Sequence, residues 1–310
     1  MSQPVARCFL CGESNFRHWS EATDVEYFTT DKTFSFKECQ NCKLLMIDPV
    51  PADQLRTIYP SNYYSFIEPK KSIVNNIKEW LDKRRFKHIL NRLTSEHLKV
   101  LDVGGGSGWL LNFVRSLSVR VKETFVVDID KNAESLAIQN GHKYFLGRIE
   151  DFQTTEKFDF VLLLNLIEHV SDPLAVMKKI SDILTPGGIL LIKTPNYDSL
   201  DARLYRNKNW GGYHCPRHWV LFGKESFQRL AMTAALKITE FSYTQGAPFW
   251  AVSTLASLHR KGLVKLSAAR PAFMHPLFAP LLAVFGALDL LRAPFSKTSQ
   301  MFITLSKENS

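Results

Sequence analysis

The sequence predicts an α/β protein with a doubly wound, largely parallel sheet. From about residue 98 onwards, short apolar runs alternate with stretches of helical periodicity, a pattern typical of strand–helix–strand units. The first of these runs ends abruptly in Gly104, Gly106 and Gly108, as a buried strand does where it enters a tight turn ahead of a helix. The chain has 310 residues, enough for one large domain and a small appendage.

Composition indicates a globular protein that is moderately basic. Hydrophobic residues make up 45% of the chain and charged residues 22%, which is ordinary for a folded domain. The formal net charge of +9 favours an anionic partner, without choosing among a phosphate-bearing substrate, nucleic acid and a membrane surface. Because the first residues contain no apolar signal segment, we predict a cytoplasmic protein, free or peripheral at the inner face of the membrane.

Two Cys-x-x-Cys pairs stand near the N-terminus. Cys8 and Cys11 form the first pair, and Cys39 and Cys42 form the second. Two such turns can present four thiolates to one tetrahedral ion, so we predict a structural zinc site in a zinc-ribbon-like module over residues 1–70. Redox pairs and chance spacing are the alternatives. Cys215 is expected to be an unligated thiol.

Residues 71–97 are predicted to form a basic connecting helix, because apolar residues recur at near-helical spacing opposite lysines and arginines. This helix either packs on the main domain with a solvated basic face or offers that face to an anion.

The glycine-rich turn at 104–108 predicts a nucleotide-cofactor site. A Cβ there would keep backbone N–H groups away from a ligand at the helix N-terminus. Trp109 stands where a dinucleotide fingerprint would have its third glycine, which favours a nucleoside with a compact charged tail over a pyrophosphate. Asp128 ends the next predicted strand, 125–128, where a carboxylate can accept hydrogen bonds from two ribose hydroxyls.

The later core elements follow in strand–helix order. Asp172 and Pro173 provide an N-cap and a first-turn proline for one helix, which we expect to end at 186–188. The other expected elements are a helix over 133–138, strands over 144–146, 158–165 and 189–193, a helix over 224–235, a strand over 236–243 and a last edge strand over 299–306.

An apolar insertion, 246–298, is predicted before the last strand. Residues 271–288 contain no Asp, Glu, Lys or Arg, but Pro276, Pro280 and Gly286 interrupt them. A bilayer span needs about 20 apolar residues, so this stretch is too short and too broken. We expect a helical segment that either touches a membrane surface through 271–293 or forms a lid or dimer surface over the site.

Three motifs together resemble the class I S-adenosylmethionine-dependent methyltransferases. They are Leu-Asp-Val-Gly-Gly-Gly-Ser-Gly at 101–108, Val-Val-Asp-Ile-Asp at 126–130, and Phe-Asp-Phe-Val at 158–161 with Glu-His-Val-Ser-Asp-Pro at 168–173. The resemblance covers about residues 98–245. It implies a seven-stranded Rossmann-like sheet in a domain over 98–310, whose last strand inserts antiparallel. With its cysteine module, the chain is similar to methyltransferases of bacterial surface-polysaccharide and sugar-modification pathways.

The resemblance also implies a set of residues that bind S-adenosylmethionine. The glycines would let the backbone approach the methionine portion, with a buried acid near its ammonium group, a strand-end acid on the ribose and apolar residues beside the adenine. The residues so assigned are Asp102, Gly104, Gly106, Gly108, Asp128, Ile129, Ile149 and Asn165.

Histidines are the candidate catalytic bases. A hydroxyl or carbon acceptor must lose a proton, and imidazole is suited to accepting it near neutral pH. His169 follows Glu168 at the end of the predicted strand 158–165. His214 and His218 belong to a segment that resembles the Pro-Arg-His segment of polysaccharide-pathway methyltransferases, with Arg217 as a phosphate or carboxylate partner.

We therefore predict a methyltransferase for a small or glycan-linked acceptor, such as a nucleotide- or lipid-linked sugar. The alternatives are a membrane-surface O-methyltransferase of the lipid-quinone type, which shares the Glu-His-Val segment, and a non-enzymatic zinc-dependent scaffold. A nucleic-acid partner is not expected, because the basic residues do not form an extended surface interleaved with aromatic residues. The acceptor, the methylated atom and the oligomeric state are not predicted.

Overall fold

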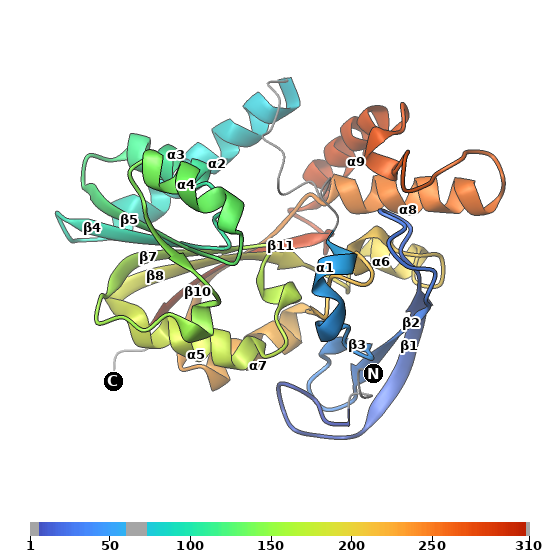
Figure 1. Cartoon of the computed structure of the whole chain (residues 1–310), viewed down its shortest axis with the longest axis horizontal. Coiled ribbons are helices and arrows are strands. Elements are labelled where there is room, and N and C mark those ends of the chain that lie inside the picture. Colours follow the sequence, from blue (N-terminus) through green and yellow to red (C-terminus); the bar gives the residue numbers. More distant parts are fainter. Residues whose placement is uncertain (1–5, 60–72, 308–310) are drawn as a thin grey trace.

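The computed structural model describes residues 6–59 and 73–307, and its largest element is a seven-stranded sheet (Figure 1). The strand order is β10-β11-β8-β7-β4-β5-β6, so the expected doubly wound, seven-stranded Rossmann-like sheet is confirmed. Its strands are β4 (Leu98–Val103), β5 (Val121–Asp128), β6 (Lys143–Leu146), β7 (Phe158–Leu164), β8 (Leu184–Pro195), β10 (Leu236–Thr244) and β11 (Gln300–Lys307).

Six strands run in the same direction, and β11 runs against them, pairing antiparallel with both β8 and β10. The expected edge position of this last strand is wrong, because β11 lies inside the sheet and β10 forms the edge. Met301 and Ile303 belong to the buried cluster on one face, and Phe302 belongs to the cluster on the other. A strand that is buried on both faces belongs in the interior of a sheet.

A second sheet of four strands lies at the N-terminal end of the chain. It consists of β1 (Phe16–Ala22), β2 (Phe34–Cys39), β3 (Leu45–Asp48) and β9 (Val220–Leu221), in that order. The fourth strand comes from the core half of the chain, and one buried cluster joins Leu44 to Phe222 and Phe227. The N-terminal part thus shares both a sheet and a core with the rest of the protein, and the division at residues 70 and 97 stays a prediction.

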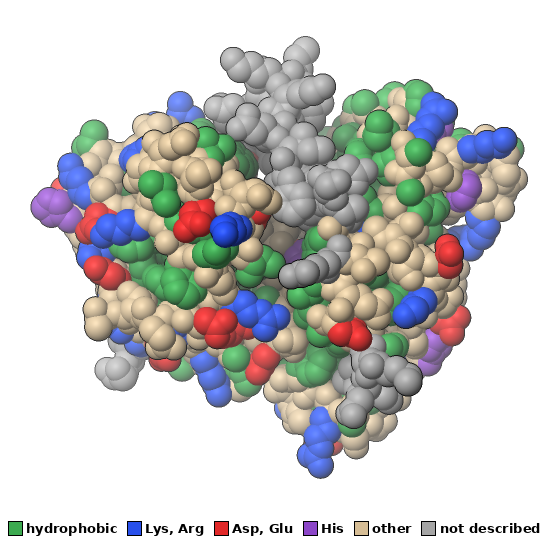
Figure 2. Space-filling model, viewed as in Figure 1, with side chains coloured by type: hydrophobic (Ala, Val, Ile, Leu, Met, Phe, Trp, Pro, Cys, Tyr) green, Lys and Arg blue, Asp and Glu red, His purple; other side chains and the backbone are tan. Residues whose placement is uncertain are grey.

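The insertion before β11 is helical, as expected. It contains α8 (Ala247–Arg260), η6 (Ala272–Met274) and α9 (Phe278–Arg292). Asp289 of α9 is fully buried and accepts hydrogen bonds from the Gly246 N–H (3.0 Å) and the Ser299 hydroxyl (3.1 Å). Leu291 is 76% exposed. At the upper right of Figure 2, where α8 and α9 lie, hydrophobic side chains are exposed among lysines and arginines. Within residues 6–59 and 73–307, no helix is both long and apolar enough to cross a bilayer.

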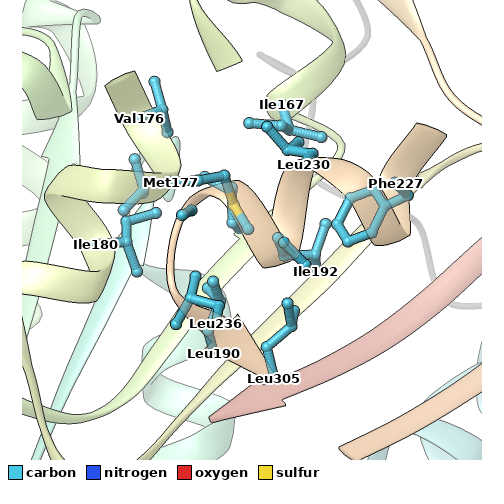
Figure 3. Packing of buried hydrophobic residues seen from close by; sticks show 14 of the residues in the cluster. Ile167, Val176, Met177, Ile180, Leu190, Ile192, Phe227, Leu230, Leu236 and Leu305 are labelled. Carbon is cyan, nitrogen blue, oxygen red and sulfur yellow. The ribbon is translucent and has the colours of Figure 1, made fainter. Parts of the chain in front are cut away.

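Helices cover both faces of the large sheet. On one face, Met177 and Ile180 of α5 and Phe227 of α7 point toward Leu190 and Ile192 of β8 (Figure 3). The other face carries α2, α3 and α4. The bounds are α2 (Ile73–Arg92), α3 (Trp109–Leu117), α4 (Lys131–Gln139), α5 (Pro173–Ile183) and α7 (Lys224–Thr233).

Two expectations about helices have a clear outcome. The connecting helix α2 packs on the main domain through Phe86, Ile89 and Leu90, although residues 71–72 and the side chains of 73–80 lie outside the described part. The expected helix end at 186–188 is wrong: α5 ends at Ile183, and Leu184 already pairs with Phe158 at the start of a longer β8.

The remaining short elements position the site. They are η1 (Ala52–Gln54), α1 (Leu55–Ile58), η3 (Ile149–Asp151), η4 (Ile167–His169), α6 (Leu200–Leu204) and η5 (Gly211–Tyr213).

Candidate functional site

The turn between β4 and α3 presents open backbone at the carboxyl end of the sheet. Gly104, Gly106 and Gly108 have φ angles of +79°, +53° and +75°. A Cβ on Gly108 would stand 2.2 Å from Cδ2 of His142, so only glycine fits there. A Cβ on Gly106 would meet nothing within 4 Å. The turn is therefore tight on its inner side and open on its outer side, as a ligand cradle requires.

Asp128, at the end of β5, holds this turn. Its Oδ2 accepts a hydrogen bond from the Gly106 N–H (2.8 Å), and its Oδ1 accepts one from the Asp130 N–H (2.9 Å). The carboxylate is only half-buried, and each oxygen has a further lone pair that can accept from a ligand hydroxyl. Ile129, the next residue, is 68% exposed.

Asp102, at the end of β4, is buried directly under the turn. A Cβ on Gly105 would stand 2.7 Å from Cγ of Asp102. Burial, followed by the nearby charge of Asp128, raises the pKa of Asp102 to about 8. A cation above the turn would stabilise the ionised form and lower that pKa again.

Ile149 and Asn165, the other two residues expected to bind the cofactor, have different surroundings. Ile149 in η3 is buried in the core, so its side chain serves packing. Asn165 follows β7 with φ +53°, and its side-chain oxygen accepts from Gln300 (3.4 Å). The neighbouring Leu166 lies against the glycine turn, because a Cβ on Gly104 would stand 3.2 Å from its Cδ1. The loop after β7 therefore adjoins the cradle.

The structure brings the three candidate histidines together. The ring centroids of His169 and His218 are 4.6 Å apart, those of His214 and His218 are 4.9 Å apart, and those of His169 and His214 are 6.1 Å apart. Burial, with the charge of His214, lowers the pKa of His169 to about 3, and burial lowers the pKa of His218 as well. The neutral imidazole is thus the stable form of both.

A buried ion pair holds the histidine segment in place. Nη2 of Arg217 lies 2.8 Å from Oδ2 of Asp24, and neither side chain is exposed. Nε of Arg217 donates to the carbonyl of Ile58 (2.6 Å), and the guanidinium carbon lies 4.5 Å from the centre of the Tyr27 ring. The carboxylate that Arg217 binds is therefore one of this chain.

Sequence reasoning missed the N-terminal residues that reach this cluster. The Glu26 carboxylate hydrogen-bonds to Nδ1 of His214, and the Tyr59 hydroxyl lies 3.0 Å from Nδ1 of His169. Both contacts join residues more than 100 positions apart. No local pattern marks such partners, and only the density of polar residues around 214–218 indicated that the segment is part of a site.

The four cysteines of the paired motifs also come together. The sulfur atoms of Cys8 and Cys42 are 3.4 Å apart, and those of Cys11 and Cys39 are 3.5 Å apart. All four lie within 4.8 Å of one another, a separation that a tetrahedral ion with bonds of about 2.3 Å can bridge. Cys215 is not part of this group; its thiol donates to the carbonyl of Ala22 (3.5 Å). The residues therefore fit a four-sulfur metal site.

Comparison with known proteins points to one family. A family model described as a methyltransferase domain matches residues 77–240. A ubiquinone biosynthesis O-methyltransferase of Bradyrhizobium sp. (strain ORS 278) is 32% identical over 107 residues, covering 32% of this chain and 40% of that protein. The protein of the same name from Haemophilus ducreyi is 32% identical over 133 residues, covering 35% of this chain and 54% of its own length. The chain thus spans about half the length of these curated relatives, or less.

Among solved structures, the [4+2]-cyclase SpnF is similar over 74% of this chain and 81% of its own, with 13% sequence identity and a TM-score of 0.48.

The raised pKa of Asp102 predicts how stability depends on pH. The folded protein binds the proton of the Asp102 carboxyl more tightly than the unfolded chain does, so protonation of Asp102 stabilises the fold. This stabilisation is complete below about pH 4 and is lost as the pH rises through about 8. Between pH 6 and 8 the loss should be about 2 kcal/mol. We expect urea unfolding of Asp102→Asn to lack this loss, whereas Asp182→Asn, an exposed acid, should follow the parent. Equal pH dependence in Asp102→Asn and the parent would contradict the assignment.

Proposed function

The chain belongs to the methyltransferase domain family, and we propose that it transfers a methyl group from S-adenosylmethionine to a small or glycan-linked acceptor. The observation that carries this proposal is the glycine turn, open at Gly106 and braced by Asp128 at the end of the neighbouring strand. Ligands of open α/β sheets bind at this edge. The turn brings backbone without side chains to this edge, and the strand end offers a carboxylate.

We assign the cofactor contacts to residues around this turn. Asp128 would accept from the ribose hydroxyls, and the exposed Ile129 would pack beside the adenine ring. Asp102 would lie near the ammonium group of the methionine portion, whose charge would favour its ionised form. Backbone at Gly104, Gly106, Gly108 and Ile149, with a contact at Asn165, would complete the site.

The cofactor supplies an electrophilic methyl group on a sulfonium. The protein must align the acceptor with it and exclude water. The buried aromatic and histidine side chains of segment 210–219 form the dry surroundings that this task requires.

Among the candidate bases, we favour His214. A carboxylate on Nδ1 orients an imidazole and stabilises the imidazolium that forms when Nε2 takes a proton, and Glu26 occupies that position. Both side chains line one small cavity, together with Gly211 and Tyr213. In His169 and His218, Nδ1 hydrogen-bonds to a backbone carbonyl oxygen instead. A neutral carbonyl stabilises an imidazolium less than a carboxylate does.

Two acceptor classes compete. A nucleotide- or lipid-linked sugar is the class that the sequence predicts. The names of the curated relatives favour a hydroxyl of a lipid-quinone-type molecule, and the exposed apolar side chains of α9 would suit contact with a membrane surface through 271–293. Flotation with anionic liposomes tests the membrane contact that the quinone class requires: loss of binding in Val284→Ser/Leu291→Ser supports that contact, and no binding by the parent argues against the quinone class.

Calorimetry with S-adenosylhomocysteine tests the proposed activity at its first step. We expect the parent protein to bind it, and Asp128→Ala to bind about thirtyfold more weakly, because about 2 kcal/mol of hydrogen bonding to a charged group is lost. Asp182→Ala removes an exposed acid and should bind as the parent does. A folded parent protein that does not bind the compound would refute the proposal, and an unchanged affinity in Asp128→Ala would refute the placement of the ribose.

We also propose that the four-cysteine cluster holds a structural zinc ion. Such a closed site leaves no position for substrate and stabilises the fold around it. Protein reconstituted with Co²⁺ should show thiolate-to-cobalt absorption, and Cys39→Ser should lose most of it and unfold at a lower temperature. Cys215→Ser, which alters a thiol outside the cluster, should keep both. Absence of that absorption in the parent would contradict the zinc site.

A further inference from the structure

We propose that Glu168, His169 and His218 bind one divalent transition-metal ion. One potential ligand atom from each residue lies within 4.8 Å of the other two. Glu168 and His169 come from η4, directly after β7, and His218 comes from the segment before β9. Two imidazoles and one carboxylate form a ligand set that suits divalent ions such as Mn²⁺, Fe²⁺, Co²⁺ or Zn²⁺. This site is separate from the four-cysteine cluster and contains none of its residues.

The carboxylate of Glu168 is arranged as a ligand. The side chain is fully buried, and its Oε2 accepts a hydrogen bond from the Thr194 hydroxyl (2.9 Å). Its Oε1 has no hydrogen-bond partner among the residues that the structure describes. A buried carboxylate oxygen without a partner is costly, since it has lost its hydration and gained nothing in return. A cation beside Oε1 would supply the missing interaction.

The neighbouring imidazole of His218 does not supply it. Oε1 of Glu168 lies 4.0 Å from Nε2 of His218, which is too long for a hydrogen bond. An ion between the two atoms would bring both within ligand distance after small side-chain movements, since metal–nitrogen and metal–oxygen bonds of this kind measure about 2.0–2.2 Å.

Both histidines can keep the lone pair on Nε2, which in His218 is the nitrogen that faces Glu168. Nδ1 of His218 lies 2.8 Å from the carbonyl oxygen of Gly212, and Nδ1 of His169 lies 3.1 Å from that of Arg217. A carbonyl oxygen can only accept, so these hydrogen bonds place the proton on Nδ1 and the lone pair on Nε2. The Tyr59 hydroxyl, 3.0 Å from Nδ1 of His169, can share that N–H as a second acceptor. Metal-ligating histidines are usually oriented in this way, by a carbonyl on the other ring nitrogen.

The site lies next to the glycine turn. Glu168 and His169 follow Leu166, which packs against Gly104, and His169 is partly exposed. Binding of the ion does not depend on the proposed activity. Its role does rest on that activity: an ion here would bind an acceptor hydroxyl and lower the pKa of that hydroxyl.

Mn²⁺ is the probe of choice, because it prefers nitrogen and oxygen ligands to the thiolates of the cysteine cluster. We expect the full-length parent to bind one Mn²⁺ in a calorimetric titration. Glu168→Gln and His218→Gln should each bind it at least about a hundredfold more weakly, because each loses a direct ligand. The surface histidine variant His88→Gln, which lies far from η4 in the sequence and is exposed, should bind as the parent does.

No Mn²⁺ binding by the parent, or equal binding by folded Glu168→Gln and His218→Gln, would overturn the proposal. If those variants do not fold, pulsed electron paramagnetic resonance of Mn²⁺-loaded parent decides: couplings to two imidazole nitrogens support the site, and their absence refutes it. S-adenosylhomocysteine binding by the same samples keeps the two proposals separate. A protein that binds the nucleoside but no Mn²⁺ refutes the metal site alone, and the reverse refutes the proposed activity alone.

Discussion

The buried ion pair between Asp24 and Arg217 is the interaction on which the rest of the structure depends. One guanidinium connects three segments: it binds the carboxylate in the loop after β1, the Ile58 carbonyl at the end of α1, and the Cys215 carbonyl within its own segment. Burial alone would raise the pKa of Asp24, yet the hydrogen bond and the charge of Arg217 hold that pKa below its usual value. Removing one partner would leave an uncompensated buried charge, which is strongly destabilising.

The ion pair also explains where the histidine cluster lies. The Arg217 carbonyl orients His169, His218 is the next residue in the chain, and Glu26 is two residues beyond Asp24. The cluster is therefore built across the joint between the N-terminal sheet and the large sheet. The glycine turn differs, because β4 and β5 build it from residues close together in one sheet. The proposed cofactor half of the site is thus local, whereas the proposed acceptor half depends on tertiary packing.

This difference sets what could be predicted from the sequence. The glycine turn, Asp128 and the cysteine pairs have fixed short spacings, and the structure brings each group together as expected. Asp24, Glu26 and Tyr59 belong to no such pattern, since each meets its partner only after both sheets have packed. The interior position of β11 was missed for a related reason. Its pairing with β8 depends on which strands of the assembled sheet still have an unpaired edge. Local periodicity predicts that a strand forms, and only the assembled sheet decides its neighbours.

A double-mutant cycle on the Asp24–Arg217 pair tests most directly whether this ion pair joins the two parts of the protein. The free energy of unfolding in urea would be measured for the parent, Asp24→Asn, Arg217→Gln and the double variant. We predict a coupling energy of about 3 kcal/mol, because the second substitution removes the charge that the first one leaves unpaired. Single-variant effects that add to within about 0.5 kcal/mol would contradict this account.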